Sequence, residues 1–480
     1  MQKYKKILLA LTLIFVFLIV YSPHQDYKFP YHVDEWHHIT EAIKLKQGQY
    51  AGGITGYRIG FHILLVALSY FIDLVLSYQF LPAIWAAISA LVLFHITNKL
   101  TKNYWIALFA AIFFASIKSN VNFTGLWFFT PLTFAIPLIY LSIYFFTQGL
   151  EKENKKYIIA SLAIMLSLIF IHSISLLFAI PFLTIYALTK HQYLKKEWKF
   201  FSLFLLIPIL GLLFYSFMTS IPLSNAFSRL LSALKFRKEW GVFIWNNSFL
   251  ELYSFIGYAL AIIGTVGILA FEKSRKKYLP YILWPIAMLI SIYIYKQTGT
   301  SYLTPYQRNL YYFAISLPLL SALGLHYTLN SIKTQIKKLT ENENKIKLIK
   351  KTTFIVLLII VFILTFQSYY ETPEPLKLYR VIEQNDYEAM MFLSNYPQST
   401  VMAHFTPSTA IYPVSGHKPV GTIVFYGNRG DTEKFFESSD CKTKQEILNK
   451  HNASFVLSSF PINCSWELIY EKENYIYKIK

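Results

Sequence analysis

The residues best suited to chemistry lie in one short segment near the N-terminus, which reads Tyr-His-Val-Asp-Glu-Trp-His-His over positions 31–38. If this segment is helical, Asp34 shares a face with His37 and His38, three and four residues later. A carboxylate beside an imidazole can act as a general base, and Asp34, His37 and His38 together can ligate a divalent metal ion. The alternative is structural, because the helix dipole favours Asp34 or Glu35 at the start of a helix. The residues alone leave both interpretations open.

Two further polar residues lie at the ends of apolar runs. Arg308 borders a long apolar run, and a guanidinium group there matches the geometry of a phosphate. Its alternative role is an interfacial anchor whose charged end reaches the lipid headgroups. His172 lies between two apolar runs, where it is either a site residue or a helix-end histidine with satisfied hydrogen bonds.

The chain that carries these residues has the composition of a membrane protein. Of its 480 residues, 55% are hydrophobic and only 15% are charged, whereas soluble proteins carry roughly 25% charged residues. We predict a polytopic α-helical membrane protein with about eleven transmembrane helices. These helices are expected at 7–21, 80–97, 105–117, 131–147, 157–171, 173–188, 200–219, 249–271, 278–295, 306–329 and 352–369.

Two helices between the first two spans are expected to lie at the membrane surface. Residues 36–45 form an amphipathic run that carries the end of the acidic and histidine-rich segment. The run 59–76 is apolar, but Asp73 near its end would need to be neutralised in a deep span. We therefore interpret 59–76 as an interfacial or re-entrant helix that does not cross the membrane.

Charge sets the expected orientation. The net charge is +19, and dense basic clusters such as residues 272–277 fall in alternate loops. This bias predicts a cytoplasmic N-terminus and an extracytoplasmic C-terminal region in the cell membrane. The same distribution explains the positive charge without nucleic acid as a partner, since no nucleic-acid-binding motif is present.

The expected domains are a transmembrane domain at 1–370 and a soluble extracytoplasmic α/β domain at 371–480. Within the second, the pattern predicts helices at 386–395, 431–437 and 443–451 and strands at 400–404, 454–458, 467–470 and 475–479. Cys441 and Cys464 are the only cysteines. Outside the cytosol they can form one disulfide, and two free buried thiols are the alternative.

A first span, an external loop with Val33-Asp34-Glu35-Trp36 and two interfacial helices together resemble the GT-C superfamily of polyprenyl-phosphate-sugar-dependent glycosyltransferases. The pattern is most similar to the protein O-mannosyltransferase and aminoarabinose transferase branch. The resemblance in topology covers the whole chain, whereas the motif matches strongly only at the acidic pair. It implies that Asp34 is the catalytic carboxylate, with Glu35 its neighbour and a divalent metal ion as a possible cofactor.

The chain departs from the branch at two places. Relatives often carry Lys or His followed by Pro before the second interfacial helix, where this chain has Arg58 and His62 in Tyr-Arg-Ile-Gly-Phe-His. Arg58 can still supply positive charge for a lipid phosphate, and His62 can supply a hydrogen bond. Relatives also often place an acidic residue before Pro at the fourth span, where this chain reads Phe129-Thr130-Pro131.

The resemblance therefore implies transfer of a sugar from a polyprenyl-phosphate donor to a glycan, lipid or protein acceptor at the extracytoplasmic face. Asp34 and Glu35 would be catalytic, Arg58, His62, His172 and Arg308 would bind the donor phosphate, and membrane lipids would surround the protein. Two alternatives are a flippase or carrier for lipid-linked saccharides and a non-catalytic envelope assembly protein.

Overall fold

A computed structural model describes residues 2–50, 58–119, 125–233, 235–239, 249–271, 275–339, 343–366, 380–423 and 427–479. The chain divides into two compact units. The first, which we call the helical unit, comprises Met1–Gln25, Ala51–Phe61 and Phe80–Glu374. The second, the loop-and-tail unit, comprises Asp26–Tyr50, His62–Gln79 and Pro375–Lys480. Each unit is described separately.

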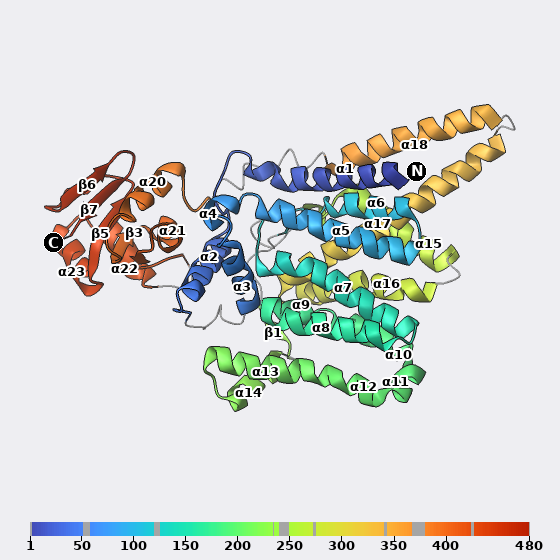
Figure 1. Ribbon diagram of the computed structural model, residues 1–480, viewed down its shortest axis with the longest axis horizontal. Helices are drawn as coiled ribbons and strands as arrows, with labels where there is room; N and C mark the ends of the chain where they lie inside the picture. The colour runs from blue at the N-terminus through green and yellow to red at the C-terminus, as the bar shows by residue number, and fades with distance from the viewer. Residues whose placement is uncertain are drawn as a thin grey trace. The chain divides into compact units, whose positions relative to one another are not determined.

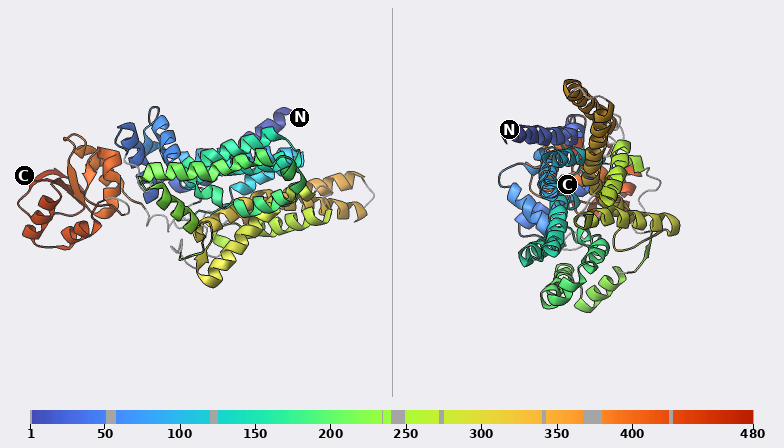
Figure 2. Two further views of the ribbon diagram at one scale, coloured as in Figure 1. Left: turned by 90° about the horizontal axis from the view of Figure 1, so that it is seen from below. Right: turned by 90° about the vertical axis from the view of Figure 1, so that its right-hand side faces the viewer.

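The helical unit consists of long helices that run alongside one another (Figures 1 and 2). Its helices are α1 (Gln2–Tyr21), α5 (Leu81–Thr101), α6 (Tyr104–Phe114), α7 (Pro131–Glu151), α8 (Lys155–His172), α9 (Ile174–Leu177), α10 (Ile180–Leu188), α11 (His191–Lys196), α12 (Trp198–Phe201), α13 (Leu206–Thr219), α14 (Leu223–Ala233), α15 (Phe255–Phe271), α16 (Leu279–Thr298), α17 (Tyr306–Leu339) and α18 (Glu343–Phe366). A two-residue strand β1 (Arg237–Lys238) pairs antiparallel with β2 (Thr300–Ser301).

Seven of the described helical segments are long and apolar enough to cross a membrane. They are Lys3–His24, Leu81–Thr101, Pro131–Glu151, Lys155–His172, Trp198–Thr219, Arg275–Thr298 and Tyr306–Ile336. The chain is thus a multi-pass membrane protein. The other four predicted spans coincide with shorter apolar helices, α6, α9 with α10, α15 and the apolar part of α18. The number of eleven spans stays a prediction.

Contact with lipid explains why many apolar side chains on these helices are exposed. None of the apolar window in Trp198–Thr219 is buried, and Ile209 and Phe217 on α13 are 52% and 82% exposed. In water such a face would be unfavourable, whereas hydrocarbon solvates it without cost. By contrast α7 and α17 are largely buried among their neighbours, so these two helices form the interior of the unit.

The run 59–76 does not form one long helix. It contains α3 (Ile59–Leu68), which has ten residues, and α4 (Leu74–Ser77), which has four. Ten helical residues extend about 15 Å, half the thickness of the hydrocarbon layer. Asp73 caps α4 by accepting a hydrogen bond from the backbone N–H of Leu76 at 3.0 Å. The length and the cap agree with the interpretation that this run does not cross the membrane.

The loop-and-tail unit contains α2 (Val33–Lys46), most of α3, α4 and the C-terminal region. That region has helices α20 (Gln384–Leu393), α21 (Phe405–Ser415), α22 (Arg429–Glu437) and α23 (Cys441–Lys450), and strands β3 (Thr400–Ala403), β4 (Lys418–Pro419), β5 (Ala453–Ser458), β6 (Glu467–Glu471) and β7 (Tyr475–Lys478). The sheet order is β4-β3-β5-β7-β6, with β3 parallel to β4 and β5, and β7 antiparallel to β5 and β6.

The predicted helices and strands of the C-terminal region all occur, with bounds that differ by a few residues. The sequence did not predict α21 or the short strand β4. Cys441 and Cys464 form a disulfide, so of the two alternatives the structure contains the bridged form. The bridge lies beside a core that includes Phe435, Val456 and Tyr477.

Candidate active site

The acidic segment forms the first turn of α2. His32 is the N-cap residue of this helix and forms a capping box with Glu35. The ring nitrogen Nδ1 of His32 accepts from the backbone N–H of Asp34 at 3.1 Å, and the backbone N–H of His32 donates to Oε2 of Glu35 at 2.9 Å. Glu35 is fully buried in this arrangement. Its carboxylate therefore satisfies the start of the helix, as the structural interpretation of the sequence expected for one of the pair.

Asp34 differs from its neighbour in accessibility. Its side chain is 27% exposed, and its Oδ2 lies 3.8 Å from Nδ1 of His32. Asp34 is thus the carboxylate of the pair that a ligand can reach. One turn later His37 is 2% exposed, and burial lowers the pKa of its imidazole to about 4, although the charge of Asp34 acts in the opposite direction. His37 is therefore neutral at physiological pH.

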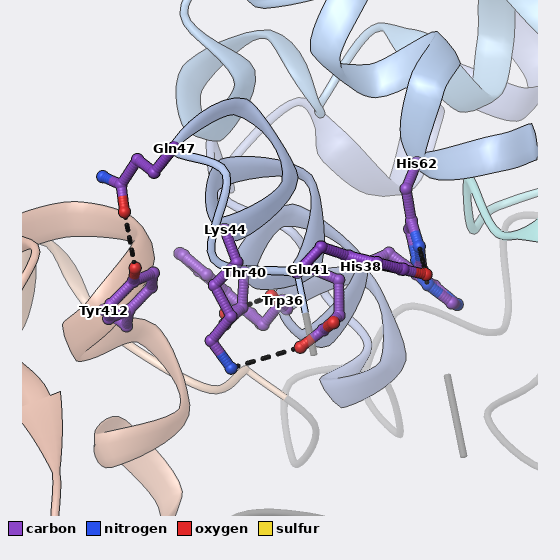
Figure 3. Close-up of polar contacts among 9 residues, drawn as sticks. Trp36, His38, Thr40, Glu41, Lys44, Gln47, His62 and Tyr412 are labelled. Atoms are coloured by element: carbon purple, nitrogen blue, oxygen red, sulfur yellow. Dashed lines mark hydrogen bonds and ion pairs between the residues drawn. The ribbon is translucent and has the colours of Figure 1, made fainter. Parts of the chain in front are cut away.

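His38 belongs to a chain of three hydrogen-bonding groups, of which His38 and His62 are buried and Tyr50 is half-buried. Its Nδ1 lies 2.9 Å from Nε2 of His62, and Nδ1 of His62 lies 3.0 Å from the hydroxyl of Tyr50. Burial raises the pKa of Tyr50, so its hydroxyl keeps its proton and can donate to His62. His62 then donates through Nε2 to His38, which leaves the Nε2–H of His38 as a donor. Figure 3 shows His38 and His62 pointing toward one another.

These contacts bear on the expected metal site of Asp34, His37 and His38. Among the residues that the structure describes, no group of three or more His, Cys, Asp or Glu side chains is close enough to hold a metal ion. One reason is visible at His38, whose Nδ1 is occupied by His62. The three residues therefore do not fit a divalent ion as arranged.

The C-terminal region contacts α2 at its far end. The hydroxyl of Tyr412, on α21, donates to Oε1 of Gln47 at 2.8 Å, and Nζ of Lys44 lies 5.7 Å from the centre of the Tyr412 ring. Lys44 also pairs with the buried carboxylate of Glu41 at 3.2 Å. Figure 3 shows these side chains between the two helices. The sequence did not indicate that Tyr412 lies beside the C-terminal end of α2.

A second contact holds the entry to α2. Arg380 pairs with Asp26 at 2.7 Å and stacks on the ring of Tyr27 at 4.7 Å. The hydroxyl of Tyr27 donates to the backbone oxygen of Ile382 at 2.8 Å. Thus both the chain before α2 and the end of α2 are attached to the C-terminal region within the loop-and-tail unit.

The three remaining predicted site residues, Arg58, His172 and Arg308, lie in the helical unit. The imidazole of His172, at the end of α8, interacts electrostatically with the guanidinium groups of both Arg58 and Arg308. These residues precede α3, end α8 and begin α17, so they are far apart in sequence. We call them the arginine cluster. His62 does not belong to it and lies in the other unit.

The backbone that follows Arg58 packs closely against the end of α8. A Cβ atom on Gly60 would lie 3.1 Å from the backbone oxygen of Phe170 and 3.2 Å from Cγ1 of Ile171. Only glycine accepts this approach without displacing its neighbour. The start of α3 is therefore packed tightly against the end of α8, at positions two residues away from Arg58 and His172.

Two residues that the sequence did not single out hold the His172 ring. Its Nδ1 lies 2.7 Å from the hydroxyl of Ser175, which lies 3.0 Å from the hydroxyl of Tyr312 on α17. All three side chains are buried. The spacing of His172 and Ser175, three residues apart, was the one available signal in the sequence. Tyr312 gave none, because tyrosine is abundant throughout the chain.

Comparisons with known proteins were informative only at the level of structure. No family model matches the chain, and neither does any curated protein. The oligosaccharyltransferase of Archaeoglobus fulgidus in complex with Zn and sulfate aligns over 93% of this chain and 68% of its own, with 14% identity and a TM-score of 0.54. The same organism's oligosaccharyltransferase AglB in complex with an inhibitory peptide and a dolichol-phosphate aligns over 95% and 70%, with 14% identity and a TM-score of 0.52.

ArnT from Cupriavidus metallidurans in the apo state aligns over 98% of this chain and 97% of its own, with 13% identity. Its TM-score is 0.49, and we draw no conclusion from it. The archaeal alignments establish a shared fold.

Proposed function

We propose that this chain, a multi-pass membrane protein with the GT-C fold, transfers a sugar from a polyprenyl-phosphate-linked donor to an acceptor at the extracytoplasmic membrane face. The resemblance to the GT-C superfamily that the sequence indicated is confirmed as a shared fold. The observation that carries the proposal is the arginine cluster, in which two guanidinium groups lie within electrostatic range of a buried imidazole in a unit of apolar helices.

The arginine cluster suits the phosphate of a lipid carrier. Arg58 and Arg308 offer planar, permanently charged donors that can bind phosphate oxygens in pairs. Arg308 also lies in the first turn of a helix of 34 residues, where the helix dipole favours an anion. An isoprenoid tail can remain in contact with apolar helices while its phosphate is bound. A solved structure of similar fold contains dolichol-phosphate, which supports a donor of this class.

On the acceptor side, we assign the catalytic carboxylate to Asp34. It is the accessible member of the acidic pair, whereas Glu35 is buried and completes the helix cap. His38 and His62 are proposed as positioning residues. Their hydrogen bonds fix the tautomer and orientation of the His38 ring, which lies on the same face of α2 as Asp34.

The reaction is a direct displacement. The acceptor oxygen or nitrogen forms a bond to the anomeric carbon while the bond from that carbon to the phosphate oxygen breaks. The acceptor proton passes to Asp34, and polyprenyl phosphate leaves with the electron pair. Arg58 and Arg308 stabilise the negative charge that grows on the leaving phosphate. No step is assigned to a metal ion, because the expected ligands do not assemble in the described residues.

The proposed orientation places the loop-and-tail unit outside the cytosol. The Cys441–Cys464 disulfide supports this orientation, since disulfides persist in oxidising compartments and are rare in the cytosol. The site would then face a compartment without nucleotide sugars, which explains why the donor is carried on a lipid. The proposed domains remain a transmembrane domain at 1–370 and an extracytoplasmic domain at 371–480.

The test is incubation of the purified protein with a panel of radiolabelled polyprenyl-phosphate sugars and a membrane extract that supplies acceptors. We expect label to move from the lipid to a new product, and Asp34→Asn to abolish this movement. A carrier would move the labelled lipid between leaflets of a liposome without forming a product. An assembly protein would do neither. Either of these results, obtained with protein that binds polyprenyl phosphate, would exclude the proposed transfer.

A further inference from the structure

The helical unit contains a cavity that the proposed transfer reaction does not use. Its volume is about 420 Å³, within the range of pockets that hold a small molecule or part of a lipid. The cavity lies between the start of α6, the C-terminal half of α17 and the start of the apolar part of α18. Trp105, Phe109 and Ile336 contribute apolar walls, whereas Asn330, Lys333 and Lys351 contribute polar groups.

The cavity is remote from the arginine cluster along the same helix. Arg308 and Lys333 are 25 residues apart on α17, which corresponds to about 38 Å at 1.5 Å per residue. This separation exceeds the roughly 30 Å thickness of the hydrocarbon layer. If Arg308 lies at one membrane interface, Lys333 therefore lies at the other. The two sites cannot share one phosphate group.

The chemistry of the lining selects an anionic amphiphile. Two exposed lysines, Lys333 and Lys351, border the cavity, and none of the described residues that line it is acidic. The aromatic and aliphatic walls offer no charged partner, so they suit an acyl chain. Lysine side chains reach the headgroup region easily and attract anionic lipids by roughly 1 kcal/mol each.

We propose that this cavity binds a phospholipid with an anionic headgroup, in the leaflet opposite to Arg308. The acyl chain lies against Trp105, Phe109 and Ile336, and the headgroup phosphate lies between Lys333 and Lys351. On the proposed orientation this is the cytoplasmic leaflet. The site does not depend on glycosyl transfer, so it stands or falls separately from the proposed reaction.

Native mass spectrometry of the full-length protein in a neutral detergent tests this proposal. Dioleoyl phosphatidylglycerol and dioleoyl phosphatidylcholine are titrated in parallel, so that only the headgroup differs. We expect at least one phosphatidylglycerol to bind more tightly than phosphatidylcholine. The double variant K333Q/K351Q should weaken phosphatidylglycerol binding about 25-fold, or fivefold for each lysine.

Two further variants distinguish the contribution of lysine charge to lipid binding from that of the cavity. K276Q/K277Q removes the same charge from another basic segment, residues 275–278, and should bind phosphatidylglycerol as the unmodified protein does. Ile336→Trp fills the cavity without changing charge and should also displace the lipid. Equal binding of the two lipids would overturn the proposal. So would unchanged binding by K333Q/K351Q, an equal loss in K276Q/K277Q, or competition by inorganic phosphate, which would indicate a simple anion site.

Discussion

Asp34 and Glu35 are adjacent in sequence, yet the structure predicts opposite consequences for their substitution. Asp34 is 27% exposed and its side chain takes no part in the helix cap, whereas Glu35 is buried and accepts a hydrogen bond from the N–H of His32. Asp34→Asn should therefore remove activity and spare stability. Glu35→Ala should lower stability and spare the activity of the protein that remains folded.

The magnitudes follow from the contacts. Loss of a general base typically lowers the rate 10²- to 10⁴-fold, equivalent to about 3–5 kcal/mol in the activation free energy. Asp34→Asn changes the charge near a helix start, so the free energy of unfolding should fall by no more than about 1 kcal/mol. Glu35→Ala leaves the part-buried backbone N–H of His32 without this acceptor and should lower the free energy of unfolding by about 1–3 kcal/mol.

The assay combines sugar transfer in proteoliposomes with thermal unfolding in detergent, and both are normalised to the monodisperse fraction of the protein. Glu35→Gln serves as the matched control, because it keeps an acceptor oxygen and should lose less stability than Glu35→Ala. The reasoning fails if Asp34→Asn retains more than a tenth of the activity. It also fails if Glu35→Ala abolishes transfer while its unfolding midpoint stays unchanged.

Four other substitutions test separate parts of the structure. Arg308→Ala should lower kcat/KM for the lipid donor about 10²- to 10³-fold, with partial recovery in Arg308→Lys, as measured by initial rates; equal rates for all three proteins would contradict a phosphate role. Tyr312→Phe removes one hydrogen bond from the chain that holds His172, so the midpoint of donor binding by fluorescence should rise about two- to tenfold without loss of folding; an unchanged midpoint would show that the hydroxyl does not position the ring. His37 has a pKa of about 4 in the folded protein and an ordinary pKa of 6.5 in the unfolded chain, so the unfolded chain binds more protons between these pH values. The free energy of unfolding should therefore be highest above pH 6.5 and fall by up to about 3 kcal/mol as the pH drops to 4. His37→Gln should reduce this pH dependence in thermal unfolding measured across that range. Cys441→Ser should lower stability by about 3 kcal/mol, the cost of opening a loop of 23 residues, and the same loss on reduction of the unmodified protein distinguishes the bridge from a packing effect.

The membrane helices were predictable because the apolar interior of a bilayer restricts which backbone structures can cross it. A spanning backbone must satisfy its hydrogen bonds internally, so long apolar runs become helices. Every predicted span coincides with an apolar helix in the structure. Length is the weaker guide. Helix α6 has 11 residues and α15 has 17, so a count of spans from length alone stops at seven.

In the C-terminal region, regular alternation predicted the strands, whereas α21 escaped prediction. Its sequence contains Pro407 and Pro413 and ends at Gly416 in a left-handed conformation, a composition that is typical of a loop. Packing overrides this local preference, since α21 buries Ala410 and Ile411. Because Tyr412 lies on this helix, the contact with Gln47 and Lys44 was also beyond the reach of the sequence.

The metal site illustrates a limit of spacing arguments. Helical spacing correctly places Asp34, His37 and His38 within one turn of one another. It does not predict which ring nitrogens are already occupied. His62 approaches His38 from a segment 24 residues away, and burial keeps His37 neutral. Such long-range contacts decide whether neighbouring ligands can converge on an ion.

The same limit applies to Arg308, whose position depends on glycines inside the apolar helices α15 and α17. On Gly264 of α15 a Cβ atom would overlap the backbone oxygen of Leu320, and on Gly324 of α17 a Cβ atom would overlap that of Leu260. The two backbones are therefore in contact, as small residues permit in membrane helix pairs. Either glycine alone reads as an ordinary residue of an apolar run. The pair allows α15 and α17 to pack backbone against backbone, and α17 carries both Arg308 and Tyr312, which interact with His172 or its partner Ser175. Substituting alanine at Gly324 would change the arginine cluster from a distance, without touching any residue in it.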